Sequence, residues 1–252
     1  MGEKIIKHVR DTLLKPIVCI KPIKKPFIHN DIIYTGQTYY STPDEDMSDF
    51  AVGFYNIVYG EILKNGMLND GHLLNKNFAG DTMNSFINIA KLADFEKNPF
   101  ETKKALLDYY YSYHCLANFW VLPFNIGRRS AKLNLYDSFD EFLKKINNES
   151  DYKKTLGKYE LYIDAIPYND FLKKHFLNDY TPTNIAYKED TVIDLIVNAK
   201  TMMELRASAI ANSDKAAAIH KYFSELNLIK ENETRHKEQG YDRFARIVDW
   251  GI

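Results

Sequence analysis

The chain has 252 residues, enough for one large domain or two small ones with a sizeable buried core. Its hydrophobic fraction of 45% and charged fraction of 27% are those of an ordinary soluble globular protein, and a formal net charge of −1 excludes a global field that attracts nucleic acid or membranes. Because Cys19 and Cys115 are its only cysteines, a disulfide framework is excluded, and we expect reduced thiols in a cytoplasmic protein.

Residues 1–43 are predicted to form a short N-terminal helix followed by an extended arm. Apolar residues at three- and four-residue spacing give the helix one apolar face: Ile5, Ile6, Val9, Leu13 and Leu14. This segment lacks the continuous apolar run of a signal peptide. From residue 17 to residue 40, prolines punctuate segments of β-type composition, which indicates one or two short strands at a sheet edge. We expect strand only in this region.

Residues 44–252 are predicted to form a helical core, and the whole chain a single domain. A helix is expected to start at the acidic residues Asp44 to Asp46, which suit a helix N-terminus. After a glycine-containing loop, Asp81 or Thr82 is expected to cap another helix. Later helices are expected at 138–146, where Ser138 and Glu141 form a capping-box pattern, and at 152–163, 171–177, 191–211, 213–226 and 241–250. No internal repeat or low-complexity linker divides the chain, which favours one domain over two.

The stretch ALLDYYYSYHCLANFWVLPFNIGRRSAKL, at residues 105–133, is the most aromatic part of the chain. No charged side chain lies between Asp108 and Arg128, although tyrosine, phenylalanine and tryptophan are dense there. Such rings bury the most area per residue, so we predict a central aromatic-rich helix at about 100–122, ended by Pro123. The predicted fold is therefore mainly α. The stretch is too polar and too broken to span a membrane.

His114 and Asn118 are the predicted catalytic pair. On a helix, residues four apart lie one above the other, so the Asn118 amide would hold the imidazole beside it. Apolar surroundings would lower the pKa of His114 and keep it neutral, as a general base requires. The alternative is a core histidine bonded to a tyrosine hydroxyl or a backbone carbonyl.

Arginines supply the predicted ligand-binding residues at the end of this stretch. Arg128 and Arg129 follow a glycine, and one of them could bind a phosphate or carboxylate through its forked guanidinium. A salt bridge to the acidic segment at residues 137–141 is the alternative. Arg206, midway along a long predicted helix, is a candidate buried charge.

Asp81 and Asn84 complete the predicted ligand-binding set. They follow Gly80, and a glycine turn before a helix N-terminus can bind an anion through backbone N–H groups. The single glycine and the Asp81 carboxylate weaken this interpretation, because Asp81 would occupy those donors itself.

No metal and no cofactor are predicted. The seven histidines include no pair at three- or four-residue spacing, and there is no cysteine cluster. The patterns GxxxxGK[ST], GxGxxG, HExxH and GxSxG do not occur.

Several segments carry a resemblance: FAGDTMNSF, YHCLANFWVLPFNIGRR, DSFDEFLKKI, KHFLNDY and the stretch from Arg206 to Ile210. They resemble a family of uncharacterised bacterial proteins whose members share a GDTMNSF-like segment, an H-x-[IL]-[AG]-N-F-x-x-x-P run and a late arginine-containing helix. The resemblance covers residues 78–210 and implies positions of interest but no activity. Ala207 and Ser208 depart from the late pattern, where a glycine and a basic residue are expected.

Two functions remain open from the sequence. The first is a ligand-binding or enzymatic pocket for a phosphate-containing substrate, a nucleotide or nucleic acid, built from the residues named above. The second is a non-catalytic helical interaction or structural module in which the same residues hold the core together. The near-neutral net charge favours the second for long nucleic acids, whereas the close spacing of polar residues in an aromatic run favours the first.

Overall fold

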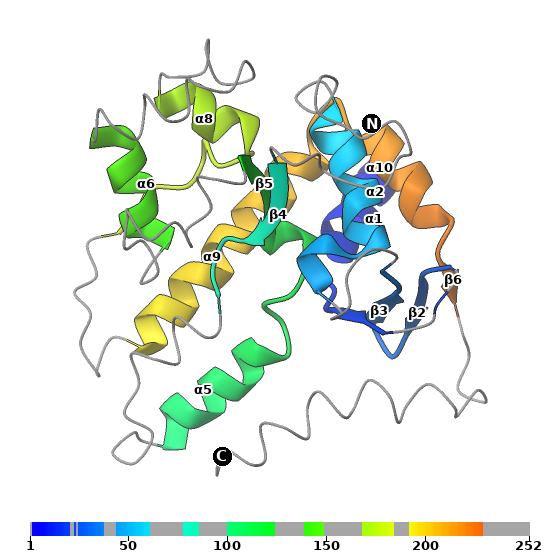
Figure 1. The fold of residues 1–252 in the computed structure, drawn as a ribbon, viewed down its shortest axis with the longest axis horizontal. Coiled ribbons are helices and arrows are strands. Elements are labelled where there is room, and N and C mark those ends of the chain that lie inside the picture. The colour runs from blue at the N-terminus through cyan, green and yellow to red at the C-terminus, as the bar shows by residue number, and fades with distance from the viewer. Residues whose placement is uncertain are drawn as a thin grey trace.

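The computed structural model describes residues 2–20, 23, 25–37, 44–60, 78–85, 100–123, 139–148, 168–183 and 192–228. Its helices are α1 (Glu3–Leu13), α2 (Asp49–Val58), α5 (Phe100–Tyr110), α6 (Phe139–Asn148), α8 (Tyr168–Lys174), α9 (Val192–Ala211) and α10 (Ala216–Ser224), with 3₁₀ turns η1 (Glu45–Met47) and η2 (Leu116–Asn118). Its strands are β1 (Ile17–Cys19), β2 (Phe27–His29), β3 (Ile32–Thr35), β4 (Phe78–Thr82), β5 (Phe119–Pro123) and β6 (Asn227–Leu228). Strands thus occur along the chain, and the prediction of a mainly α helical domain is wrong: the fold is mixed α/β (Figure 1).

The four-stranded sheet has the order β1-β3-β2-β6. Strands β2 and β3 form an antiparallel hairpin whose turn residues, Asn30 and Asp31, both have positive φ, as a two-residue hairpin turn requires. β1 pairs with β3 and β6 pairs with β2, both in parallel, so residues at the two ends of the described chain meet in one sheet. Three strands lie between residues 17 and 40, where one or two were predicted, and the expectation of strand only in this region is wrong because β4, β5 and β6 lie outside it.

The second sheet, an antiparallel pair of β4 and β5, overturns two further predictions. Phe119 lies opposite Thr82, and Pro123 lies opposite Phe78. Residues 78–82 are therefore a strand, so Asp81 and Thr82 do not cap a helix. The helix predicted at about 100–122 ends at Tyr110, because serine, tyrosine, histidine and cysteine follow and all are weaker helix formers. The run FWVLP then satisfies its backbone groups by pairing with β4.

Most of the remaining helix predictions are confirmed. The expected helix at residues 3–14 is α1, and the helix expected after Pro43 appears as η1 followed by α2. The segments α6, α8, α9 and α10 lie where the spacing of apolar residues predicts them. The helices predicted at 152–163 and 241–250 lie outside the described residues.

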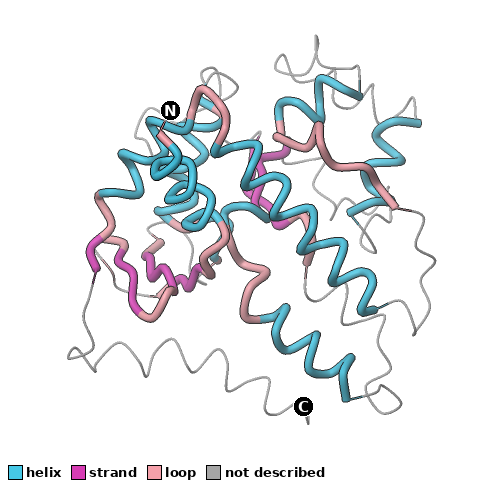
Figure 2. Tube along the Cα trace, turned by 180° about the vertical axis from the view of Figure 1, so that it is seen from behind, coloured by secondary structure: helices cyan, strands magenta, loops and turns pink. Residues whose placement is uncertain are grey.

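Helix α9 runs through the middle of the molecule, between α6 and α8 on one side and α1, α2 and α10 on the other (Figures 1 and 2). It packs against α1, α5 and η2. The largest fully buried side chains are mostly aromatic: Trp120, Arg206, Tyr55, Tyr59, Tyr109, Phe50, Phe54 and Phe119. The predicted aromatic core is thus confirmed for the described part. Within those ranges, no helix combines the length and apolar character that crossing a membrane requires.

Strand β4 approaches η1 closely at Gly80. A Cβ atom added there would lie 2.4 Å from the backbone oxygen of Asp46 and 3.0 Å from Met47 Sδ. The Gly80 N–H itself donates to Met47 Sδ at 3.1 Å. Only a residue without a side chain fits this contact, which brings the end of β4 next to the acidic turn.

We predict that Gly80→Ala lowers the free energy of unfolding by about 1–3 kcal/mol, since the added methyl must displace backbone atoms. Gly60→Ala is the matched control, because a Cβ at Gly60 meets no atom within 4 Å. Chemical denaturation of both variants measures the difference. Equal effects of the two substitutions would contradict the close approach of β4 and η1.

Candidate functional site

The acidic turn η1 points its carboxyl groups into the protein. Glu45 is fully buried, and Asp46 is 9% exposed. Ser48 caps α2 by accepting from the Ala51 N–H at 3.3 Å, and its hydroxyl donates to the Glu45 backbone oxygen at 2.7 Å. Because Ser48 occupies the helix end, the preceding carboxyl groups are available for contacts in the interior.

Glu45 contacts His114, which lies in the turn between α5 and η2. Their closest approach is 3.1 Å, between His114 Nδ1 and Glu45 Oε2. The other carboxyl oxygen of Glu45 accepts from the Cys19 N–H at 3.3 Å. The backbone oxygen of His114 accepts from the Ile17 N–H at 2.7 Å. Strand β1 therefore positions both members of the pair.

The imidazole of His114 is neutral at physiological pH. Burial lowers its pKa to about 4, while the Asp44 carboxylate acts in the opposite direction. The approach of Nδ1 to Glu45 Oε2 is close in distance but does not have the geometry of a hydrogen bond, and a neutral imidazole carries one hydrogen and one lone pair on its two ring nitrogens. The side chain is still 18% exposed, so the ring reaches the surface. A neutral imidazole can accept a proton at the ring nitrogen that carries the lone pair.

Beside this pair, the surroundings of a second carboxyl group favour its protonated form. The pKa of Asp46 is raised well above 3.8, first by burial and then by the nearby charges of Asp44 and Asp81. A hydrogen bond with Asp44 raises it further, and the Thr82 hydroxyl, which donates to Asp46 Oδ2 at 3.3 Å, opposes the shift. The raised pKa favours the protonated form of Asp46, which can donate to Asp44.

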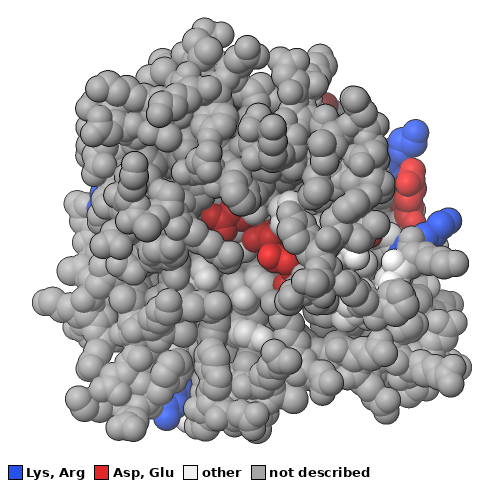
Figure 3. All heavy atoms as spheres, viewed as in Figure 1, with Lys and Arg blue, Asp and Glu red and all other residues white. Residues whose placement is uncertain are grey.

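Acidic side chains gather near the middle of the face shown in Figure 3, in the part of the view where Figure 1 places β4. Asp44 and Asp81, whose charges raise the pKa of the buried Asp46, are themselves half-exposed. Among the described residues, no group of three histidine, cysteine or acidic side chains is arranged to hold a metal ion.

Asn118 does not contact His114 through its amide. Its Nδ2 donates to the backbone oxygens of Asn84 at 2.9 Å and Tyr113 at 2.7 Å, and its Oδ1 accepts from the Asn84 N–H at 3.0 Å. These bonds fasten the end of β4 to the turn that carries His114. The expected arrangement of the two residues one above the other on a helix is wrong, because Asn118 lies in η2 and His114 in the preceding turn.

Arg206 is fully buried and its guanidinium binds internal oxygens. Nη1 donates to the backbone oxygens of Leu116 at 3.0 Å and Ala117 at 2.8 Å. Nε donates to the His175 oxygen at 2.8 Å, and Nη2 donates to the Tyr59 hydroxyl at 2.9 Å. In the described part of the chain, Arg206 therefore binds the fold itself.

The predicted site residues are brought together only in part. Asp81 and Asn84 lie at the end of β4, near Asp46 and Asn118 respectively. The Arg206 guanidinium donates to the backbone carbonyl groups of η2 and therefore does not join them. Arg128 and Arg129 lie outside the described residues. The roles predicted for these residues stay predictions.

The sequence interpretation missed Glu45 and Asp46 as site residues. Their signal was present as a run of acids after Pro43, which also suits a helix N-terminus. What the run does not reveal is its partner, since His114 meets Glu45 only through the tertiary packing of β1, η1 and the turn after α5.

Comparison of the chain with protein-family models, with curated proteins and with solved structures gives no match. The resemblance to the bacterial family therefore stays a prediction. Its two most specific segments, around GDTMNSF and YHCLANFWVLP, include the strands that pair as β4 and β5. The protein is thus a mixed α/β protein whose candidate site combines two pairs of side chains. Glu45 and His114 form a buried carboxyl–imidazole pair, and Asp44 and Asp46 form a carboxyl–carboxyl pair beside it.

We predict that Asn118→Ala lowers the free energy of unfolding by about 1–3 kcal/mol, because buried backbone groups of Asn84 and Tyr113 lose their partner. Asn84→Ala is the control, since the short bonds to residue 84 use its main chain. Urea unfolding compares the two. A loss for Asn84→Ala as large as that for Asn118→Ala would rule out the main-chain clamp.

We predict that Asp46→Asn raises stability at about pH 8 and leaves it little changed near the ordinary aspartate pKa. The folded state holds the Asp46 proton more tightly than the unfolded state, so the wild type gains stability below 3.8 and loses it as the pH rises through the raised pKa. Asparagine cannot ionise and avoids this loss.

Thermal melts over this pH range check the expectation for Asp46. Asp108→Asn is the control, because the Asp108 side chain is exposed. The same pH-dependent gain in both variants would show that net charge, not the buried carboxyl group, is responsible.

Proposed function

We propose that the protein is an enzyme that works by general acid–base catalysis, with His114 as the base and the Asp44–Asp46 pair as the acid. The observation that carries this proposal is the 3.1 Å contact between His114 Nδ1 and the buried Glu45 carboxyl group. A carboxylate behind an imidazole fixes the tautomer and the ring orientation that a base needs.

In the base step, His114 Nε2 takes a proton from a substrate group or from a water molecule. The imidazolium that forms lies 3.1 Å from the Glu45 carboxyl group, and the negative charge of Asp44 favours the protonated ring. Burial lowers the pKa of His114 from the ordinary value of 6.5 to about 4, so the free site is a weaker base than an exposed histidine. Stabilisation of the imidazolium by the nearby carboxyl groups offsets this loss.

In the acid step, the proton shared by Asp44 and Asp46 passes to the leaving group. Burial and the neighbouring carboxylates keep Asp46 protonated above the usual range of an aspartate. Asp44 is half-exposed, so it is the member of the pair that faces a bound substrate.

The charge of the site favours a neutral or cationic substrate. Asp44, Asp46 and Asp81 lie together, and their negative potential opposes a phosphate group. Of the arginines proposed to bind phosphate, Arg206 gives its donors to the fold. A phosphate-containing ligand remains a proposal that depends on Arg128 and Arg129.

The test combines binding and turnover. Thermal melts with spermidine, methyl glucoside, AMP and inorganic phosphate compare cationic, neutral and anionic probes, and chromogenic esters, glycosides and phosphodiesters probe hydrolysis. We expect cationic or neutral compounds to raise the Tm, and His114→Gln to lower kcat by about 10²–10⁴-fold, the usual contribution of a general base. Glu45→Gln should lower kcat as well, because glutamine does not stabilise the imidazolium.

His29→Gln is the matched control, since it makes the same substitution at a buried histidine on β2, outside this site. It should leave kcat unchanged at neutral pH. Turnover that survives in His114→Gln would contradict the base assignment. A Tm raised only by AMP and phosphate would contradict the substrate class.

A further inference from the structure

Two histidines far apart in the sequence share a hydrogen bond between α1 and α10. His8 Nδ1 lies 2.9 Å from His220 Nδ1, and the rings meet edge to face with centroids 4.8 Å apart. Both side chains are partly buried where the two helices pack. Among the described residues no third histidine, cysteine or acid completes a metal site with them.

A contact between two ring nitrogens at this distance fixes the protonation state of the pair. One Nδ1 must carry a hydrogen and donate, and the other must carry a lone pair and accept. If both nitrogens carry a hydrogen, the bond is lost and two positive rings face each other. The contact therefore exists only while at least one imidazole is neutral.

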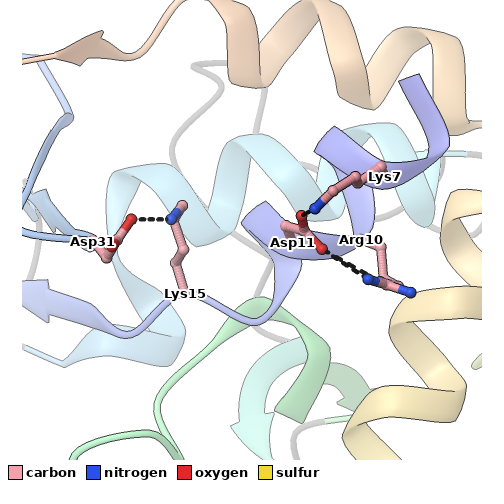
Figure 4. Close-up of polar contacts among 5 residues, drawn as sticks. All are labelled: Lys7, Arg10, Asp11, Lys15 and Asp31. Carbon is pink, nitrogen blue, oxygen red and sulfur yellow. Dashed lines mark hydrogen bonds and ion pairs between the residues drawn. The ribbon is translucent and has the colours of Figure 1, made fainter. Parts of the chain in front are cut away.

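The charged groups near His8 do not neutralise a second proton. Asp11, one turn along α1, is bound by Lys7 and by Arg10, the latter at 3.1 Å, and Lys15 is bound by Asp31 (Figure 4). Burial, His220 and Lys15 lower the pKa of His8, and Asp11 opposes them. Helix α9, which also packs on α1, adds no charged group to those acting on His8.

We propose that His8 and His220 form a pH-sensitive clasp that holds α1 against α10 when the pair is singly protonated or neutral and opens when both rings are protonated. α1 leads directly into β1, whose Ile17 and Cys19 N–H groups bind His114 and Glu45. Opening the clasp thus loosens the segment that positions the carboxyl–imidazole pair.

The direction of the pH dependence follows from the two states. The open state binds the His8 proton at the ordinary pKa of 6.5, and the closed state binds it less tightly. The clasp therefore contributes fully above pH 6.5, and its contribution is lost as the pH falls through the lowered pKa. Between pH 6.5 and the lowered pKa, the opening constant rises by up to about tenfold for each unit that the pH falls, because the open state holds one more proton in that range.

Hydrogen exchange of the whole chain, measured at about pH 7.5 and about pH 5.5 and corrected for the intrinsic exchange rate, tests whether protonation opens the clasp. We expect protection of the α1 amides to fall at the lower pH in the wild type, with α9 as the internal reference. His8→Gln keeps a polar side chain that does not titrate, so its α1 protection should not change with pH. Lys221→Gln, on the exposed side of α10, should behave as the wild type does.

NMR titration of the His8 ring gives a second measurement that does not depend on the stability of one variant. The midpoint should lie below 6.5 in the wild type and move up towards 6.5 in His220→Gln. Equal pH dependence of α1 exchange in the wild type and His8→Gln would overturn the proposal. So would a His8 midpoint that does not respond to His220→Gln.

Discussion

The buried guanidinium of Arg206 joins segments that are far apart in the chain. It binds the carbonyl groups of η2, the end of α8 at His175 and the hydroxyl of Tyr59 after α2. Burying a charge costs free energy unless its donors are satisfied, so these oxygens must stay in place around α9. Tyr59 accepts from Arg206 and donates to His175 Nδ1 at 3.1 Å, which extends the network. Burial and the positive charge of Arg206 lower the pKa of His175 well below its usual value, so the ring accepts as a neutral imidazole.

The candidate site is linked to this network through η2. Fixing the carbonyl groups of η2 fixes Asn118, whose amide then holds Asn84 at the end of β4. β4 in turn lies against η1 at Gly80, and η1 presents Glu45 to His114. The chain thus keeps its buried positive charge near carbonyl groups and its carboxyl groups in a separate cluster, where they raise the pKa of Asp46.

The aromatic run at residues 105–133 shows how tertiary structure overrides a local pattern. Its density of rings correctly indicates burial, and Tyr109, Phe119 and Trp120 are fully buried. Burial alone does not distinguish a helix from a strand when the run is short and apolar. The pairing of Phe119–Pro123 with Phe78–Thr82 decides for a strand, since each provides the backbone partners that the other needs.

The sequence by itself determined the amphipathic helices, the hairpin region and the aromatic core, because apolar periodicity and turn residues act over a few neighbouring positions. It also singled out His114, Asn118 and Asp81 as polar groups in unusual surroundings. Only the tertiary structure decided their partners: Glu45 for His114, backbone groups for Asn118, and carbonyl oxygens for Arg206. The physical reason is that a buried polar group needs a partner but does not specify one. The partner is set by which distant segments the packing of the core brings together.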